Sequence, residues 1–165
     1  MRNCWRVVHA AVQGRGHIKS NIPCQDKTYA LCLDEGCVIA LADGAGSAKF
    51  SHYGADAVIR CVANSLYFNF KEYYETEELE KNAHRVVELI KGRLFPITNL
   101  LGCKMNDLAS TLLVVAVCDE KYVIVHIGDG VVAYLENENL KVASHPANGE
   151  FLNTTYFITD SNAAC

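Results

Sequence analysis

The sequence lacks any run of about eighteen apolar residues, and its N-terminal stretch, MRNCWRVVHAAVQGRGH, holds too short an apolar core for a signal peptide. It also lacks any cluster of lysine and arginine, and its formal net charge is -4. These absences argue against a membrane-spanning helix, and they argue against nucleic acid or an anionic membrane as the main partner. We therefore expect a cytoplasmic protein.

The sequence has no Cys-x-x-Cys pair, although it contains eight cysteines. Such a count raises disulfides and a zinc site as alternatives, but the cysteines are scattered, and Cys32, Cys37, Cys61 and Cys118 fall among apolar residues. Reduced cysteine commonly packs as a small hydrophobic residue. We predict reduced cysteines that help to fill the core.

No internal repeat, low-complexity segment or interdomain linker divides the chain. Its 165 residues, of which 50% are hydrophobic, suffice to bury about two-thirds of the unfolded surface. We predict a single domain over residues 1–165.

Strand patterns occupy both ends of the sequence. Short β-branched and aliphatic runs between turn residues are typical of buried strands. Asp34–Gly36 forms a tight turn between two of these runs, which predicts a hairpin, and the last four runs indicate an antiparallel meander. The predicted strands are Trp5–Val12, Lys27–Leu33, Cys37–Ala42, Thr111–Val117, Tyr122–Ile127, Val131–Leu135 and Leu140–Ala143.

Two helices are expected between the strands. After Ser51, which can cap a helix, apolar residues recur every three or four positions as far as Leu66 and give one apolar face. A second helix begins near Thr76 and is broken or kinked at Pro96. Strands, then helices, then strands predict an α+β domain in which helices cover sheets.

The stretch Gly36–Ser47, GCVIALADGAGS, ends a predicted buried strand in an acid and glycines. Asp43 lies where the strand leaves the core, and Gly44 and Gly46 allow a sharp bend and the close approach of a ligand. Such a corner presents a carboxylate and a main-chain carbonyl to a hard cation, since Mg²⁺ and Mn²⁺ prefer oxygen ligands. Taken alone, Asp-Gly is equally an ordinary turn dipeptide.

Two further acids lie at similar junctions. Asp26 ends the polar loop Gly14–Asp26, and Asp129 lies between two glycines that interrupt an apolar stretch. Each alone also fits a simple loop or turn residue. If the strands share a pair of sheets, the three carboxylates meet at one rim, and two divalent cations would relieve their repulsion. A binuclear site of this kind activates water and clamps an in-line displacement at phosphorus, which is a phosphatase design.

Four motifs in this order resemble those of the metal-dependent type 2C Ser/Thr protein phosphatases, the PPM family, and particularly their bacterial branch. They are PCQD (Pro23–Asp26), ALADGAGSA (Ala40–Ala48), AST (Ala109–Thr111) and HIGDG (His126–Gly130). The resemblance covers nearly all of the chain. It implies an α-β-β-α sandwich, in which helix pairs flank two antiparallel sheets, with a binuclear Mn²⁺ or Mg²⁺ site at one edge.

The resemblance also implies roles for individual residues. By that match Asp43 bridges two metal ions, and the carbonyl of Gly44 ligates one of them. Asp26 belongs to the same ligand set, and it follows Gln25, which stands where many members have a glutamate that holds a metal through water. Asp129 matches the acid associated with a third, more weakly bound ion. The implied reaction is attack by the bridging hydroxide on a phosphoserine or phosphothreonine of a protein substrate, without a covalent phosphoenzyme.

Two residues depart from the family pattern near the expected site. Ala45 stands where many members have a histidine that is a candidate acid for the leaving alkoxide, so His17 or water would have to serve. Asn21 stands where several members have an arginine that grips the substrate phosphate, which leaves Arg15 or Lys19 as substitutes.

A third departure concerns the C-terminal part of the sequence. Asp160, in ITDSN, superficially resembles the acid of the family's later Ser/Thr-Asp-Gly motif, but Ser161 replaces the glycine whose backbone freedom shapes that turn. We therefore expect an N-terminal portion of a phosphatase domain that lacks at least two ligating carboxylates. The second ion should then bind poorly, and activity should be slight or absent.

A non-catalytic member of the same fold, acting as a regulatory or binding module, is the main alternative. Gln25, Ala45 and the incomplete C-terminal part fit it. The retained Asp26, Asp43 and Asp129 favour an enzyme, because acids gathered at one rim are costly to keep.

A cysteine hydrolase that uses Cys24 with His17 is a third class of function. The loop offers no helix N-terminus that would favour the thiolate form of the cysteine, so this class is disfavoured.

Overall fold

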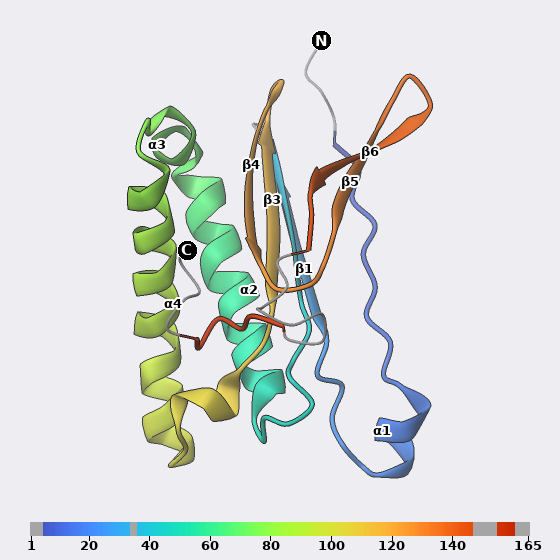
Figure 1. Ribbon diagram of the computed structural model, residues 1–165, viewed down its shortest axis with the longest axis vertical. Helices are drawn as coiled ribbons and strands as arrows, with labels where there is room; N and C mark the ends of the chain where they lie inside the picture. Colours follow the sequence, from blue (N-terminus) through green and yellow to red (C-terminus); the bar gives the residue numbers. More distant parts are fainter. Residues whose placement is uncertain (1–4, 34–35, 147–154, 161–165) are drawn as a thin grey trace.

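The computed structural model describes residues 5–33, 36–146 and 155–160. Figure 1 shows two long helices on one side of an antiparallel sheet and a separate hairpin on the other side. The sheet has four strands, β1 (Lys27–Leu33), β2 (Gly36–Ala42), β3 (Leu112–Cys118) and β4 (Lys121–Ile127), in the order β1-β2-β3-β4. The hairpin consists of β5 (Val132–Glu136) and β6 (Asn139–Ser144).

The β1–β2 hairpin and the β3–β4 hairpin confirm the strands expected from the alternating and apolar runs. In the first hairpin Lys27 pairs with Ala42 and Leu33 pairs with Gly36. In the second, Leu112 pairs with Ile127. Together with the helices, the two antiparallel sheets confirm the predicted α+β class.

Helix α2 (Ser51–Phe68) packs its apolar face on the sheet and forms the centre of the core. The face predicted from the sequence is buried, because residues three and four apart share one side of a helix. It meets the inward-facing side chains of β2 and β3, which alternate along each strand. The buried residues of this contact are Ala55, Val58, Ile59, Val62 and Leu66 of α2, Val38, Ala40 and Ala42 of β2, and Leu112, Val114 and Ala116 of β3.

Helix α4 (Leu79–Leu101) packs on α2 and is longer than expected. The sequence predicts a break or a kink at Pro96, and a break is wrong, because the helix continues past Pro96 to a left-handed C-terminal glycine, Gly102. Pro96 lies on the exposed side of α4, where the ring meets solvent rather than the core. A short helix, α3 (Phe70–Glu75), lies in the connection between the two long helices.

Helix α2 also begins differently from the prediction. Ser51 is the first helical residue and is fully buried, and Phe50 occupies the N-cap position without a side-chain cap. The hydroxyl of Ser51 instead accepts a hydrogen bond from Gln25.

The predicted strand Trp5–Val12 is not a strand in the structure. Val8 and Val12 are largely exposed, and the segment is joined to β1 by a side-chain contact, Nδ1 of His9 to Oγ1 of Thr28 at 2.8 Å. An apolar run becomes a strand only when a neighbouring backbone edge pairs with it, which sequence periodicity alone does not supply.

The predicted meander does not stay in one sheet after β4. β5 and β6 form their own two-stranded sheet, joined by a turn at Asn137 and Glu138 with positive φ angles of 49° and 65°. The interruption lies at Gly128–Val131, where the chain leaves the first sheet and enters the second layer.

Cys32 and Cys37 are register partners on β1 and β2, and the structure joins them in a disulfide. The prediction of reduced cysteines is therefore wrong for this pair. The two residues are five positions apart, and only the strand register places them opposite each other.

Among the helices of the described residues, none combines the length and apolar character that crossing a bilayer requires.

Candidate metal centre

Sheet order alone brings the predicted acids to one rim. In an antiparallel sheet with the order β1-β2-β3-β4, the start of β1 and the end of β2 lie at the same edge as the start of β3 and the end of β4. Asp26 directly precedes β1, Asp43 directly follows β2, and Asp129 follows β4 by two residues. The three acids therefore leave the sheet at one edge, although 103 positions separate the first from the last in the 165-residue sequence, counted as 129 minus 26.

The carboxyl of Asp43 lies within hydrogen-bonding reach of Asp26 and within the field of Asp129. Its pKa is raised from 3.8 to about 6. Partial loss of water around the carboxyl is the largest cause, followed by the hydrogen bond with Asp26 and the negative charges of Asp26 and Asp129. A carboxyl whose pKa is raised beside another carboxyl marks a place where a bound cation would be favourable.

His17 opposes this shift, since its charge lowers the pKa of Asp43. It lies on the short helix α1 (Arg15–Lys19) and is partly buried. Arg15 and Lys19, the candidate phosphate-gripping residues, are exposed on the same helix. The structure thus brings His17 near Asp43 and leaves the two cationic side chains in solvent.

The AST motif holds the backbone of the Asp43 loop. Thr111 bonds Asp43 twice: its Oγ1 accepts from the Asp43 N–H at 2.9 Å, and its own N–H donates to the Asp43 carbonyl at 2.8 Å. The N–H of Ala45 donates to the carbonyl of Ala109 at 3.0 Å. These bonds flank the isolated bridge between Gly44 and Ser110, and none of the three uses the carbonyl of Gly44.

Gly44 is required by close packing behind the site. A Cβ at this position would lie 2.9 Å from the carbonyl oxygen of Gln25 and 2.9 Å from the Cβ and Oγ of Ser51. The side chain of Gln25 is buried, and its Nε2 donates to Ser51 Oγ at 2.7 Å. Gln25 thus turns into the protein and fixes the segment before Asp26, a role that the sequence did not indicate.

Asp129 is fixed by the backbone of its loop and by one side chain. Gly128 has a φ of +116°, and a Cβ there would lie 2.6 Å from Cγ2 of Thr111. Thr155 Oγ1 donates to Oδ2 of Asp129 at 3.3 Å. Because Thr111 also bonds Asp43, the loop of Asp129 packs directly on the residue that clamps Asp43.

The donor set fits a hard divalent cation with few protein ligands. Within the described part of the chain no group of three or more His, Cys, Asp or Glu side chains is close enough to hold a metal ion. Asp26 and Asp43 are in contact, whereas Asp129 acts on Asp43 through its charge. Two adjacent carboxylates suit a Mg²⁺ or Mn²⁺ ion that keeps several waters.

Two other candidates from the sequence lie elsewhere. The carboxylate of Asp160 accepts a hydrogen bond from the N–H of Phe157 at 2.8 Å and so closes its own turn. Cys24 Sγ donates to the carbonyl of Asp26 at 3.6 Å. Neither contact resembles a nucleophile beside a base.

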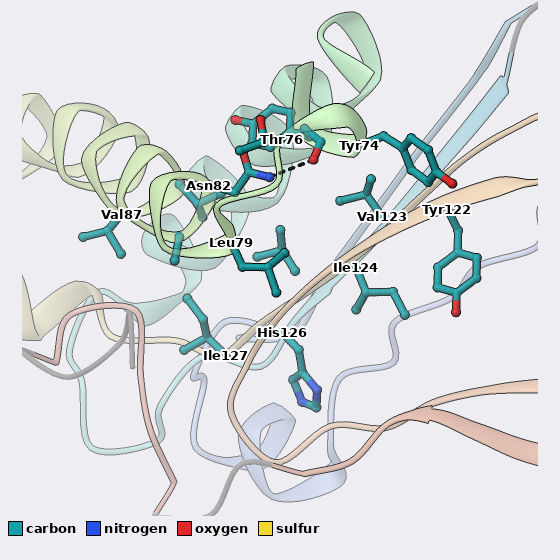
Figure 2. Close-up of a pocket in the computed structure, with 14 residues that line it drawn as sticks. Tyr74, Thr76, Leu79, Asn82, Val87, Tyr122, Val123, Ile124, His126 and Ile127 are labelled. Carbon is teal, nitrogen blue, oxygen red and sulfur yellow. Dashed lines mark hydrogen bonds between the residues drawn. The ribbon is translucent and has the colours of Figure 1, made fainter. Parts of the chain in front are cut away.

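A cavity of about 420 Å³ lies between β4 and the helices α3 and α4, and none of the three acids lines it. Figure 2 shows Tyr74, Thr76, Leu79 and Asn82 on the helical side. On the strand side the figure shows Tyr122, Val123 and Ile124. Asn82 Nδ2 donates to the carbonyl of Tyr73 at 2.7 Å and holds the connection between the two helices.

Thr111→Val tests the clamp on Asp43. The substitution keeps the shape of the side chain and removes the acceptor of the partly buried hydrogen bond from the Asp43 N–H, so we expect a loss of about 1–2 kcal/mol in the free energy of unfolding. Urea denaturation of the metal-free protein measures it. Thr28→Val, at a hydroxyl that contacts the exposed His9, is the matched control and should change the free energy by less than half of that amount. Equal losses of unfolding free energy in the two variants would mean that the hydrogen bond from Asp43 to Thr111 stabilises the protein no more than the contact of Thr28 with His9 does.

The family follows from a comparison of the whole chain. The family model described as protein phosphatase 2C matches residues 13–164. The chain therefore belongs to the protein phosphatase 2C family.

Among curated relatives, the chain is similar to Serine/threonine-protein phosphatase 3 of Escherichia coli (strain K12), with 31% identity over 167 residues. The match covers 96% of this chain and 64% of the relative, so the chain spans less than two-thirds of that protein's length. No solved structure gives a significant match.

Proposed function

We propose that this chain carries the metal-binding part of a protein phosphatase that hydrolyses phosphoserine and phosphothreonine in proteins, using two divalent ions, Mn²⁺ or Mg²⁺. The observation that supports it most is the contact between Asp26 and Asp43, in which the pKa of Asp43 is raised to about 6. The similarity to a Ser/Thr-protein phosphatase adds the substrate class.

The proposed roles follow from where each donor lies. Asp26 and Asp43 would hold the ions, and the carbonyl of Gly44 would contribute a further oxygen. Asp129 would hold a third ion more weakly, since it reaches Asp43 only through its charge. Divalent ions in this place would supply a nucleophilic water of lowered pKa and would neutralise the charge of the phosphoryl group.

His17 is the proposed proton donor to the leaving alkoxide. Its charge acts on Asp43, so the ring lies near the acids. Imidazole is the side chain that most often transfers protons near neutral pH. Ala45, buried where family members carry a histidine, cannot take this role.

The second ion should bind weakly and activity should be low, because the described residues bring only two carboxylates into contact. Phosphate release from a phosphothreonine peptide, measured against Mn²⁺ concentration, tests the function. We expect slow release that rises with Mn²⁺ and stops with a chelator. No release at any Mn²⁺ concentration, with Mn²⁺ bound, would favour the non-catalytic module.

That second candidate, a regulatory or binding module, is favoured by one contact. Gln25 is buried against Ser51 and offers no carboxylate for a metal-held water. A module would retain binding of a phosphorylated partner without releasing phosphate.

The raised pKa of Asp43 predicts opposite pH effects on stability and on metal binding. Between about pH 4 and pH 6 the folded chain holds a proton on Asp43 that the unfolded chain has lost. The contribution of Asp43 therefore raises the free energy of unfolding of the metal-free protein as the pH falls through this window. Protons compete with the ion over the same range, so Mn²⁺ affinity should fall about tenfold from pH 7 to pH 5.

Isothermal titration with Mn²⁺ and urea denaturation at both pH values measure the two effects. Comparison with Asp43→Asn isolates the stability effect of the Asp43 site, because carboxyl groups outside this cluster of acids titrate alike in both proteins. A Mn²⁺ affinity that is equal at both pH values would contradict the assignment of Asp43 as a ligand.

A further inference from the structure

A side-chain hydrogen bond joins the two sheets beside the Asp129 loop. Nδ1 of His126, on β4, lies 2.7 Å from Oγ of Ser144, on β6. Figure 2 shows the ring of His126 directed away from the helices. The bond therefore runs from the four-stranded sheet into the second layer.

Ser144 lies opposite the point where the Asp129 loop enters β5. Ser144 is the register partner of Val132, the first residue of β5. The loop Gly128–Val131 leaves β4 just after His126 and returns at Val132. The bond from His126 to Ser144 thus ties the outgoing side of the loop to the incoming side, and so closes the loop at its base.

The imidazole also packs against the loop itself. Its Nε2 is buried without a hydrogen-bond partner within the described part of the chain, and the position of a Cβ on Gly130 would lie 4.0 Å from it. Burial lowers the pKa of His126, and the Gly128 backbone and the charge of Asp129 oppose that shift only in part. The imidazole therefore borders the loop at Gly128 and Gly130, the residues on either side of Asp129.

We propose that His126 is a positioning residue, which together with Ser144 closes the base of the Gly128–Val131 loop and orients Asp129 toward Asp26 and Asp43. The role in metal binding rests on the function proposed above. The first residue of the loop is also fixed, because Gly128 packs on Thr111. With the base of the loop closed and its first residue packed, Asp129 is held in place before an ion arrives, which reduces the cost of ordering a ligand on binding.

The test uses the whole 165-residue chain and two removals of the bond, His126→Leu and Ser144→Ala. His126→Asn is the rescue variant, because the asparagine amide reaches the place of Nδ1. His84→Leu, at an exposed histidine of α4, is the matched control. Asp129→Asn identifies which part of a Mn²⁺ titration belongs to Asp129.

Two readouts separate the loop from the metal. Hydrogen exchange of the amides of Gly128–Val131 is measured without metal, beside the thermal unfolding midpoint. Mn²⁺ binding is measured by electron paramagnetic resonance of the free ion. We expect faster loop exchange in both removals, and about tenfold weaker binding of the Asp129-dependent ion. His126→Asn should restore most of the affinity, and His84→Leu should change neither readout.

Unchanged Mn²⁺ affinity and unchanged loop exchange in both removals would overturn the inference. Affinity that falls only in proportion to a lower unfolding midpoint, with no rescue by His126→Asn, would also overturn it, since His126 would then be merely structural. If Asp129→Asn binds Mn²⁺ as the native chain does, the proposed role of Asp129 fails. Loop exchange then still decides whether His126 and Ser144 close the loop.

Discussion

Asp43→Asn is expected to weaken Mn²⁺ binding by about a hundredfold or more and to stabilise the metal-free fold at the same time. The first effect follows because the substitution removes the charge and one ligating oxygen from the central acid of the site. Any Mn²⁺-dependent phosphatase turnover should fall by on the order of 10³-fold, which corresponds to several kcal/mol of lost transition-state stabilisation.

The second effect has the opposite sign because the site is repulsive without a cation. At neutral pH the ionised Asp43 lies beside Asp26 and in the field of Asp129, and these charges add to the burial that raises its pKa to about 6. An uncharged amide relieves that repulsion. Since Asp43 retains contact with solvent, we expect a gain of only about 1 kcal/mol in the free energy of unfolding.

Isothermal titration and urea denaturation measure the two effects on the same samples. Asp56→Asn is the matched control, because Asp56 pairs with Arg60 on the exposed side of α2 and should change neither quantity appreciably. A loss of Mn²⁺ binding together with a loss of stability would indicate that Asp43 supports the fold rather than the ion. Retained binding would remove Asp43 from the ligand set.

Gly54→Ala is expected to lower the free energy of unfolding by about 3 kcal/mol, or about 9 °C in melting temperature for a domain of this size. Gly54 lies on α2, where a Cβ would be 2.0 Å from the carbonyl oxygen of Leu108 and 2.8 Å from its carbonyl carbon. Both are backbone atoms, so no side-chain rotation relieves the overlap. Alanine is the better helix former, and that gain of up to about 1 kcal/mol is too small to offset it.

The same overlap should reach the metal centre. Leu108 ends the 3₁₀ helix η1 (Met105–Leu108), and the residues that follow it, Ala109–Thr111, hold the backbone of Asp43 and Ala45. Displacing η1 from α2 would move this clamp. Mn²⁺ affinity in Gly54→Ala should therefore fall below that of a protein destabilised about equally elsewhere, for example by Ile90→Ala in the core between the helices.

Gly92→Ala is the control for Gly54→Ala. Gly92 lies in α4, and nothing lies within 4 Å of the place that an alanine methyl would take, so alanine should stabilise the protein by about 0.5–1 kcal/mol. Differential scanning calorimetry compares the two. Similar melting temperatures for both variants would contradict this prediction, because they would show that η1 moves away from α2 to admit the methyl group without a loss of stability.

The elements that could be predicted from the sequence are those set by local pattern. The apolar spacing of α2 and the two hairpins around β2 and β3 needed no information from distant residues, and the structure confirms them. Trp5–Val12 shows the limit of such patterns, because this apolar segment does not pair with a strand and is not a strand itself. The contact of Cys32 with Cys37 also escaped prediction, since it depends on the register of two strands.

Some features of the candidate site could likewise be predicted from the sequence, and others could not. That Asp26, Asp43 and Asp129 lie at junctions between loops and strands could be predicted from the sequence, and antiparallel order then places the junctions at one rim. The supporting contacts could not be predicted, because they join distant positions. Thr111 bonds Asp43 across 68 residues, and Gln25 bonds Ser51 across 26.

The most direct test of the metal centre is the anomalous scattering of Mn²⁺ in crystals of the 165-residue chain. We predict a strong peak between the carboxylates of Asp26 and Asp43, within bonding distance of the Gly44 carbonyl, a weaker peak for the second ion at the same carboxylates, and a further weak peak beside Asp129. The same crystals of Asp43→Asn should show none of these peaks. Fully occupied Mn²⁺ at other residues only, with the carboxylates of Asp26 and Asp43 turned apart, would contradict the account.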